Sequence, residues 1–73
     1  MKKVFKMEDL DCAHCAAKME TGISKIDGVL SAQVNFLLQK LTLEVEDGKL
    51  DEVLEKAQKV VRKIEPDCRI IVK

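Results

Sequence analysis

Apolar residues recur every three or four positions in two stretches of the chain, and this spacing predicts two amphipathic helices. The first helix is predicted to begin between Cys12 and Cys15 and to extend to about Ile26, where the turn residues Asp27-Gly28 follow. Its apolar stripe consists of Ala16, Met19, Ile23 and Ile26. Gly22 lies inside this helix and costs it up to about 1 kcal/mol relative to alanine.

The second helix carries the most regular apolar stripe in the chain and follows the turn residues Asp47-Gly48. The stripe consists of Leu50, Val53, Leu54, Ala57, Val60, Val61 and Ile64. The segment Glu65-Pro66-Asp67 is predicted to end this helix, because proline cannot continue a helix and disfavours helical geometry in the residue before it.

Apolar and polar residues alternate in the remaining segments, as they do in strands with one buried face. The first strand is predicted at Lys3–Met7, with Phe5 and Met7 in the core, and the polar segment Glu8–Cys12 is predicted to be a loop. A hairpin is predicted around Leu38-Gln39-Lys40, and Cys68–Val72 is predicted to be the closing strand. The inward side chains of the hairpin are Ala32, Val34, Phe36, Leu41, Leu43 and Val45.

The order strand, helix, strand, strand, helix, strand predicts an α+β chain with the ferredoxin-like βαββαβ fold, formed as a single domain over residues 1–73. Right-handed crossovers place both helices on one face of a four-stranded antiparallel sheet. In this topology the first strand ends at the same edge where the hairpin turns and where the last strand begins. The loop that carries Cys12 and Cys15 is therefore expected to lie near Glu65–Cys68.

Composition and charge exclude several functions for a chain of 73 residues. Thirteen basic and thirteen acidic side chains give a net charge of zero, which argues against nucleic acid and against an anionic membrane surface. No apolar run approaches the roughly 20 residues of a membrane span, and Met1–Leu10 lacks the apolar core of a signal peptide. An odd number of cysteines, three, does not form a disulfide framework, so a cytosolic location is expected.

Cys12 and Cys15 are the residues most indicative of function. Two cysteines three positions apart at a helix start can direct both sulfurs at one point, and the helix N-terminus favours thiolate over thiol. Thiolates select copper(I), zinc and similar heavy ions, and a shell of two sulfurs is incomplete for a structural zinc site. An open shell suits transfer of the ion. The alternatives are two inert buried cysteines, a thioredoxin-like redox pair, or a metal site protected by a disulfide.

The chain resembles the heavy-metal-associated domain, which is found in soluble copper chaperones and at the N-termini of metal-transporting P-type ATPases. The resemblance covers nearly the whole chain and rests on Leu10, on the CxxC motif Cys12–Cys15, on Ile26–Val29 and on Val34–Phe36. Asp9 departs from the family pattern, because glycine is common at this position. The resemblance implies the ferredoxin-like fold and a metal site at the two cysteines.

The residue before the first cysteine bears on the choice of metal. Threonine is usual at this position in copper(I) domains of the family, whereas an aspartate such as Asp11 resembles the pattern of zinc, cadmium and lead exporters. A divalent ion also gains from a carboxylate, because it prefers four ligands and oxygen suits zinc, whereas two thiolates satisfy copper(I). Asp11 is therefore predicted to be the third ligand, the alternative being that it is a solvated loop acid.

Four other side chains are weaker candidates for the metal shell. Glu65 and Asp67 would favour a divalent cation and could complete the shell, also across a metal-bridged dimer; otherwise Glu65 only ends a helix and Asp67 lies in a turn. Cys68 is a candidate ligand but is more often, as a lone cysteine entering a strand, a small buried apolar residue. His14 is a candidate nitrogen ligand, although residues inside such motifs tend to face solvent.

These predictions together indicate a domain that binds Zn(II), Cd(II) or Pb(II) for transfer to, or regulation of, a metal-exporting P-type ATPase, as its N-terminal segment. The 73 residues are not themselves an enzyme in this interpretation, and the partner ATPase acts in cis or in trans. The alternatives are a freestanding copper(I) chaperone and, in a different class, a CxxC thiol oxidoreductase. RNA binding on the sheet is disfavoured, because Phe5 and Phe36 are the only aromatic residues.

Overall fold

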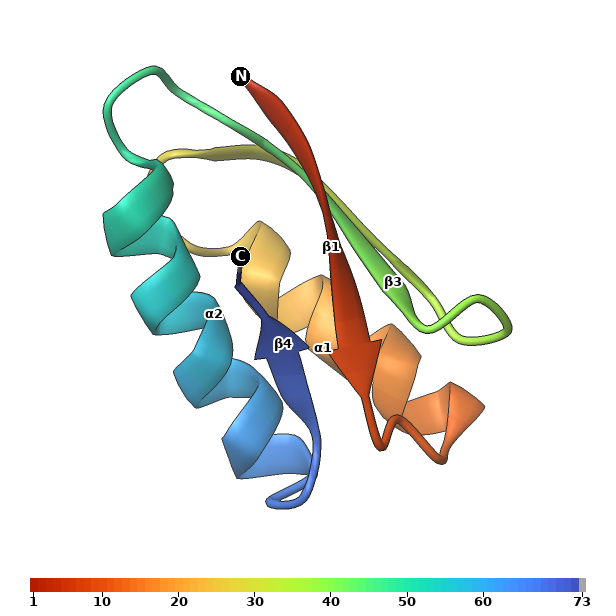
Figure 1. Cartoon of the computed structure of the whole chain (residues 1–73). Helices are drawn as coiled ribbons and strands as arrows, with labels where there is room; N and C mark the ends of the chain where they lie inside the picture. The colour runs from red at the N-terminus through yellow and green to blue at the C-terminus, as the bar shows by residue number, and fades with distance from the viewer. Residues whose placement is uncertain (73) are drawn as a thin grey trace.

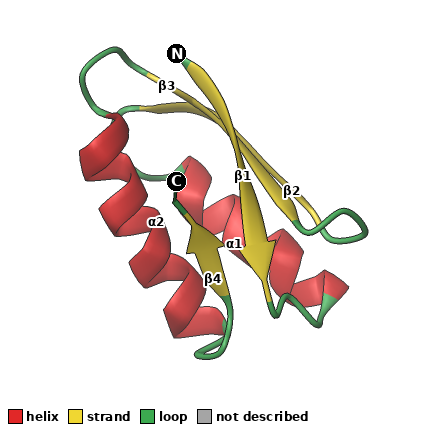
Figure 2. Cartoon of the chain, in the orientation of Figure 1, coloured by secondary structure: helices red, strands yellow, loops and turns green. Residues whose placement is uncertain are grey.

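A computed structural model describes residues 1–72 of the chain (Figure 1). Six elements follow one another in the predicted order: β1 (Lys2–Glu8), α1 (Ala13–Ser24), β2 (Val29–Asn35), β3 (Lys40–Val45), α2 (Leu50–Ile64) and β4 (Arg69–Ile71). The strands form one antiparallel sheet in the order β2-β3-β1-β4, and both helices cover the same face of it (Figure 2). The predicted ferredoxin-like βαββαβ fold is confirmed.

Several predicted boundaries were wrong by one or two residues. Helix α1 ends at Ser24 rather than near Ile26, because the N–H groups of Lys25 and Ile26 bond three residues back and form a tight turn. Strand β1 extends through Glu8, which pairs with Arg69 of β4. Strand β2 ends at Asn35, so Phe36, predicted as an inward residue of the hairpin, lies in the turn, and β4 is limited to Arg69–Ile71 instead of Cys68–Val72. The predicted span of α2 is confirmed.

The core lies between the sheet and the two helices. The central strands β1 and β3 contribute most of its strand residues, and their inward side chains are those that the alternation predicted. Met7, which was predicted to be a core residue, is 1% exposed. The most deeply buried side chains are Met7, Leu10, Met19, Ile23, Leu41, Leu43, Val45, Val53, Val61 and Cys68. All of these are aliphatic or sulfur-containing, and Phe5, which is 8% exposed, is the aromatic member of the buried core.

Gly22 allows the two helices to approach each other. A Cβ atom at this position would lie 2.8 Å from Cγ1 of Val60, which belongs to α2. Val60 is β-branched and has few rotamers through which to move away. The intrinsic cost of glycine inside α1 is therefore offset by close helix packing, which the sequence pattern alone does not reveal.

Helix side chains cover both outer edges of the sheet. On α2, Gln58 donates to the backbone oxygen of Ile70 (2.7 Å) and accepts from its N–H (3.1 Å). On α1, the Glu20 carboxylate accepts from the N–H of Val34 at the β2 edge (3.0 Å). These bonds satisfy edge groups that would otherwise be available to pair with another chain.

Among residues 1–72 no helix is both long and apolar enough to cross a bilayer.

Candidate metal centre

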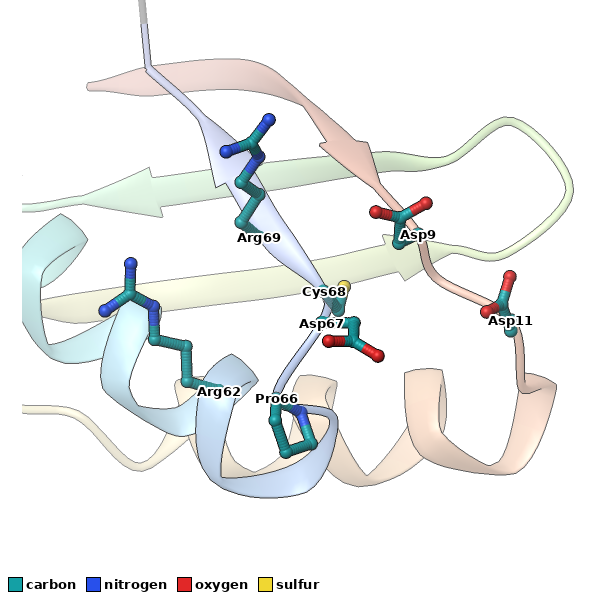
Figure 3. A pocket seen from close by; sticks show the side chains of 7 residues that line it. All are labelled: Asp9, Asp11, Arg62, Pro66, Asp67, Cys68 and Arg69. Atoms are coloured by element: carbon teal, nitrogen blue, oxygen red, sulfur yellow. The ribbon is translucent and has the colours of Figure 1, made fainter.

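Three segments meet at one end of the sheet, as the topology predicted. In Figure 1 the loop after β1 and the loop before β4 lie at the bottom of the picture, and the β2–β3 turn lies at the right. The backbone N–H of Met7 donates to the oxygen of Gln39 (2.7 Å), which joins the first two segments. Asp9 and Asp11 line the same hollow as Pro66, Asp67 and Cys68, which brings the third segment against the first (Figure 3).

Cys12 is the N-cap residue of α1. Its backbone is extended (φ −135°, ψ 121°), its C=O accepts the first helical bond from Ala16, and its sulfur accepts the N–H of Cys15 at 3.4 Å. The sulfur thus occupies the position where a serine or aspartate oxygen usually satisfies the first free N–H groups of a helix. The N–H groups of Cys15 and, to a smaller extent, His14 lower the pKa of the Cys12 thiol.

Cys15 lies one helical turn further and remains close to Cys12. The pKa of the Cys15 thiol is raised, first because it shares a hydrogen bond with the sulfur of Cys12, then because of partial burial and the negative charge beside it. The first proton therefore leaves the pair from Cys12, while Cys15 retains its own and donates it to the Cys12 thiolate. Both sulfurs are partly exposed, so an incoming ion can reach them.

The Cys15 sulfur also responds to two more distant charges. The positive charge of Lys18, one turn along α1, lowers the pKa of Cys15. Glu65, at the end of α2, raises the pKa of both Cys12 and Cys15. The carboxylate of Glu65 is therefore close enough for its charge to act on both sulfurs.

The three cysteines are expected to react with iodoacetamide in the order Cys12, then Cys15, then Cys68. The thiolate is the reactive form, so at pH 7 to 8 the thiol with the lowered pKa reacts first. Mass spectrometry of partially labelled, metal-free protein measures the three rates. Labelling of Cys15 before Cys12, or of Cys68 as fast as either, would contradict the assignment.

Cys68 is a core residue rather than part of the exposed pair. It is 1% exposed, and burial, followed by the nearby charges of Glu65 and Asp9, raises the pKa of its thiol to about 11. The thiol therefore stays protonated at neutral pH. Cys68 therefore lies in the core, directly before β4, while its part in metal binding stays a prediction.

Asp9 and Asp11 lie on the loop between β1 and the cysteines. Asp9 has φ +59°, the left-handed region that glycine favours, so the departure from glycine at this position leaves the loop with a glycine-like backbone path. Asp11 is exposed at the hollow shown in Figure 3, and its charge acts on Cys68. Asp67 lines this hollow as well, whereas the two partly exposed cysteines Cys12 and Cys15 are not among its lining residues.

Glu65 is the C-cap residue of α2 and is half-buried. Its charge acts on Cys12, Cys15 and Cys68 alike. Its Oε2 atom is buried and has no hydrogen-bond partner among residues 1–72. A buried carboxylate oxygen without a partner is costly, and a cation would relieve that cost.

The remaining candidate, His14, is exposed on the first turn of α1, as expected for a residue inside the motif. Over the described part of the chain, no three His, Cys, Asp or Glu side chains converge tightly enough to hold an ion. The two cysteines are therefore in place, whereas a third ligand would have to reach them by side-chain rotation.

Gln39 is a residue of this region whose importance the sequence pattern did not indicate. Its side chain bonds both backbone groups of Leu10, which is 29 positions away along the chain. In the sequence it appears only as a polar residue in a predicted turn, and no spacing rule connects it to the cysteine loop.

The chain is similar to known proteins over most of its length. Residues 4–67 match the model of the heavy-metal-associated domain. The cadmium, zinc and cobalt-transporting ATPase of Bacillus subtilis (strain 168) is 37% identical over 71 residues, which are 96% of this chain and 10% of that protein. The chain thus spans about a tenth of the length of this ATPase.

Two copper proteins are also similar. The copper chaperone CopZ of Staphylococcus epidermidis is 35% identical over 49 residues, which are 67% of this chain and 72% of that protein. The solution structure of the N-terminal domain of a potential copper-translocating P-type ATPase from Bacillus subtilis superposes with a TM-score of 0.73 at 30% identity. That superposition covers 94% of this chain and 84% of the other.

Proposed function

Because this chain belongs to the heavy-metal-associated domain family, we propose that it binds Zn(II), Cd(II) or Pb(II) through Cys12 and Cys15 and passes the ion on. The observation that carries this proposal is the pair of partly exposed sulfurs at the start of α1, with the first thiolate formed at the N-cap. Such a pair can hold an ion without enclosing it. A receiving protein can therefore add its own ligands before these two leave.

A carboxylate is proposed to complete the shell for a divalent ion. Asp11 precedes the first cysteine and is exposed, so its side chain can rotate toward the sulfurs. Glu65 is supported by its buried, unpartnered oxygen and by its effect on both thiols. The two thiolates balance the double positive charge, and a carboxylate adds the oxygen ligand with which a divalent ion approaches four-coordination. We propose Asp11 and Glu65 as the oxygen ligands, and His14, Asp67 and Cys68 as residues outside the shell.

Copper(I) is the alternative cargo, because CopZ and a copper ATPase are among the similar proteins and two thiolates suffice for that ion. The unpartnered carboxylate oxygen of Glu65 favours a divalent ion, since copper(I) gains little from oxygen ligands. A thiol oxidoreductase is the alternative from another class, because a lowered cysteine pKa at a helix start also suits thiol exchange. This alternative requires turnover of substrate disulfides by the metal-free protein.

The receiving partner is proposed to be a membrane metal-transporting P-type ATPase. The support is the 37% identity to the cadmium, zinc and cobalt-transporting ATPase over nearly the whole chain. Residues 1–73 would act as a single domain at the cytosolic face, either as the N-terminal segment of that ATPase or as a separate chain. A metal-bridged dimer is the proposed way to complete the shell if only one carboxylate is recruited.

Titration with cadmium, followed by thiolate charge-transfer absorbance and ¹¹³Cd NMR, tests the proposed ligands. The native protein is expected to show two sulfur ligands with oxygen beside them. Asp11→Asn and Glu65→Gln are each expected to lower cadmium and zinc affinity by about tenfold or more and to leave copper(I) affinity unchanged.

The control is Glu55→Gln, an exposed carboxylate on α2, which is expected to change neither affinity. Unchanged cadmium affinity in either site variant would remove that residue from the shell. The copper chaperone would be favoured if copper(I) bound more tightly than cadmium or zinc in chelator competition and neither site variant changed cadmium or zinc affinity. Disulfide reduction without metal uptake would favour the oxidoreductase.

A further inference from the structure

Gln39 connects the β2–β3 turn to the loop that precedes the cysteines. Its Oε1 accepts the N–H of Leu10 (3.0 Å), and its Nε2 donates to the oxygen of Leu10 (2.6 Å) and to that of Phe36 (2.9 Å). Its own backbone oxygen accepts the N–H of Met7 (2.7 Å). One residue therefore holds the loop at two points, one on each side of Asp9.

The held segment leads directly to the metal site. Leu10 is two residues before Cys12, and its side chain is 2% exposed, so both its backbone and its side chain are fixed. After Leu10 only Asp11 separates the fixed backbone from the N-cap sulfur. The position of Cys12 therefore depends on Gln39 on one side and on helix α1 on the other.

Backbone strain at the same place indicates that these contacts determine the loop path. Asp9 (φ +59°) and Gln39 (φ +54°) are the non-glycine residues with positive φ within residues 1–72, and the Met7 and Leu10 bonds join their segments. L-residues adopt this conformation at a cost, and it persists where surrounding contacts leave no alternative. The positive φ angles of Asp9 and Gln39 therefore indicate that the surrounding hydrogen bonds fix the path of this loop.

We propose that Gln39 is a positioning residue of the metal site, which holds the loop so that Cys12 stays at the N-cap beside Cys15. This inference rests on the proposed function, because it concerns the same two sulfurs. Gln39 does not itself touch the ion. Its effect is preorganisation, since a loop that is already ordered loses less conformational freedom when the ion binds.

Gln58 provides a matched control inside the same molecule. It is also a glutamine whose side chain bonds both backbone groups of a distant residue, Ile70, but that residue lies in β4. Gln58→Ala therefore removes a similar set of hydrogen bonds without touching the cysteine loop. A purely structural role of Gln39 would make the two alanine variants behave alike.

The test compares Gln39→Ala with Gln58→Ala in the reduced chain of residues 1–73, at a temperature where both are folded. Gln39→Ala is expected to lower cadmium affinity, measured by chelator competition, by about tenfold or more, as supporting residues around metal ligands do. It is also expected to broaden the ¹¹³Cd resonance. Gln58→Ala is expected to stay within about twofold of the native protein. Equal losses in both variants, or native-like affinity in folded Gln39→Ala, would overturn the proposal.

Two measurements on the metal-free protein keep the test independent of metal binding. Amide hydrogen exchange at residues 9–12 is expected to accelerate in Gln39→Ala and not in Gln58→Ala. The iodoacetamide rates of Cys12 and Cys15 are expected to converge in Gln39→Ala alone. A native protein that takes up no cadmium refutes the proposed function, whereas unchanged exchange and unchanged rates refute the positioning role. If Gln39→Ala does not fold, Gln39→Glu, which keeps the acceptor and loses both donors, is expected to shift both readouts in the same direction.

Discussion

Replacement of both Cys12 and Cys15 by serine is expected to lower cadmium and zinc affinity by about a thousandfold or more. Structural zinc sites with four ligands contribute about 10–16 kcal/mol, so the loss of two thiolates removes several kcal/mol of binding free energy. Serine hydroxyls do not ionise at neutral pH and are poor ligands for soft ions. Chelator competition with cadmium, at a pH where the native pair binds, measures the loss.

The fold is expected to survive this double replacement. Cys12 is the N-cap of α1, and serine is among the preferred residues at that position, so its oxygen can accept the N–H that the sulfur accepts now. Circular dichroism and thermal unfolding of the metal-free variant check this. Loss of metal binding would then reflect lost ligands rather than lost structure.

Cys68 provides a control, because it is a buried cysteine outside the partly exposed pair. Cys68→Ala is expected to leave cadmium affinity within about threefold of native, because the Cys68 thiol is buried and protonated. Unchanged metal affinity in the double serine variant would refute the assignment of the pair. A loss in Cys68→Ala as large as in the double serine variant would place this buried thiol in the shell.

Leu43→Ala is expected to lower the free energy of unfolding by about 2–5 kcal/mol, the range for a buried leucine that leaves a cavity. Leu43 is 0% exposed, and in the central strand β3 it lies opposite Lys3 of β1 and Ala32 of β2. A domain of this size has only about 4–11 kcal/mol in total. The melting temperature of the metal-free protein is therefore expected to fall by roughly 10 °C or more.

Leu37 supplies the matched control, because it is also a leucine but is 87% exposed at the hairpin tip. Leu37→Ala is expected to change stability by about 0.5 kcal/mol or less. Cadmium at a hundred times its dissociation constant should restore about 2.7 kcal/mol to Leu43→Ala, since the ion binds the folded state. A loss in Leu37→Ala equal to that in Leu43→Ala would contradict the assignment of the core.

Local patterns in the sequence were sufficient to determine the elements and most of the core. The apolar side of each element can be recognised from its residue spacing, and that side is the one that becomes buried. This holds for the helix stripe at Leu50–Ile64 and for the strand alternation at Leu41, Leu43 and Val45. The element order then left few topologies, because crossovers are right-handed. The approach of the cysteine loop to Glu65–Cys68 followed from this topology alone.

The chemistry of the cysteine pair was likewise accessible from the sequence, because Cys12 and Cys15 lie within one helical turn. Their spacing at a helix start predicted that helix N–H groups would favour a thiolate, and the bond from the N–H of Cys15 to the sulfur of Cys12 agrees. What the spacing could not show is which sulfur loses its proton first. That depends on which of the two is the N-cap, and helix boundaries are set by tertiary contacts as well as by the local sequence.

Only the tertiary structure decided the contacts between segments far apart in the chain. Three such features depend on the relative placement of different elements. They are the hydrogen bonds of Gln39 to Leu10, the close approach of Gly22 to Val60, and the unpartnered oxygen of Glu65, whose charge acts on the thiols. Hydrophobic periodicity reports the orientation of a side chain relative to its own helix or strand, and it carries no information about which polar atom another segment brings to within 3 Å.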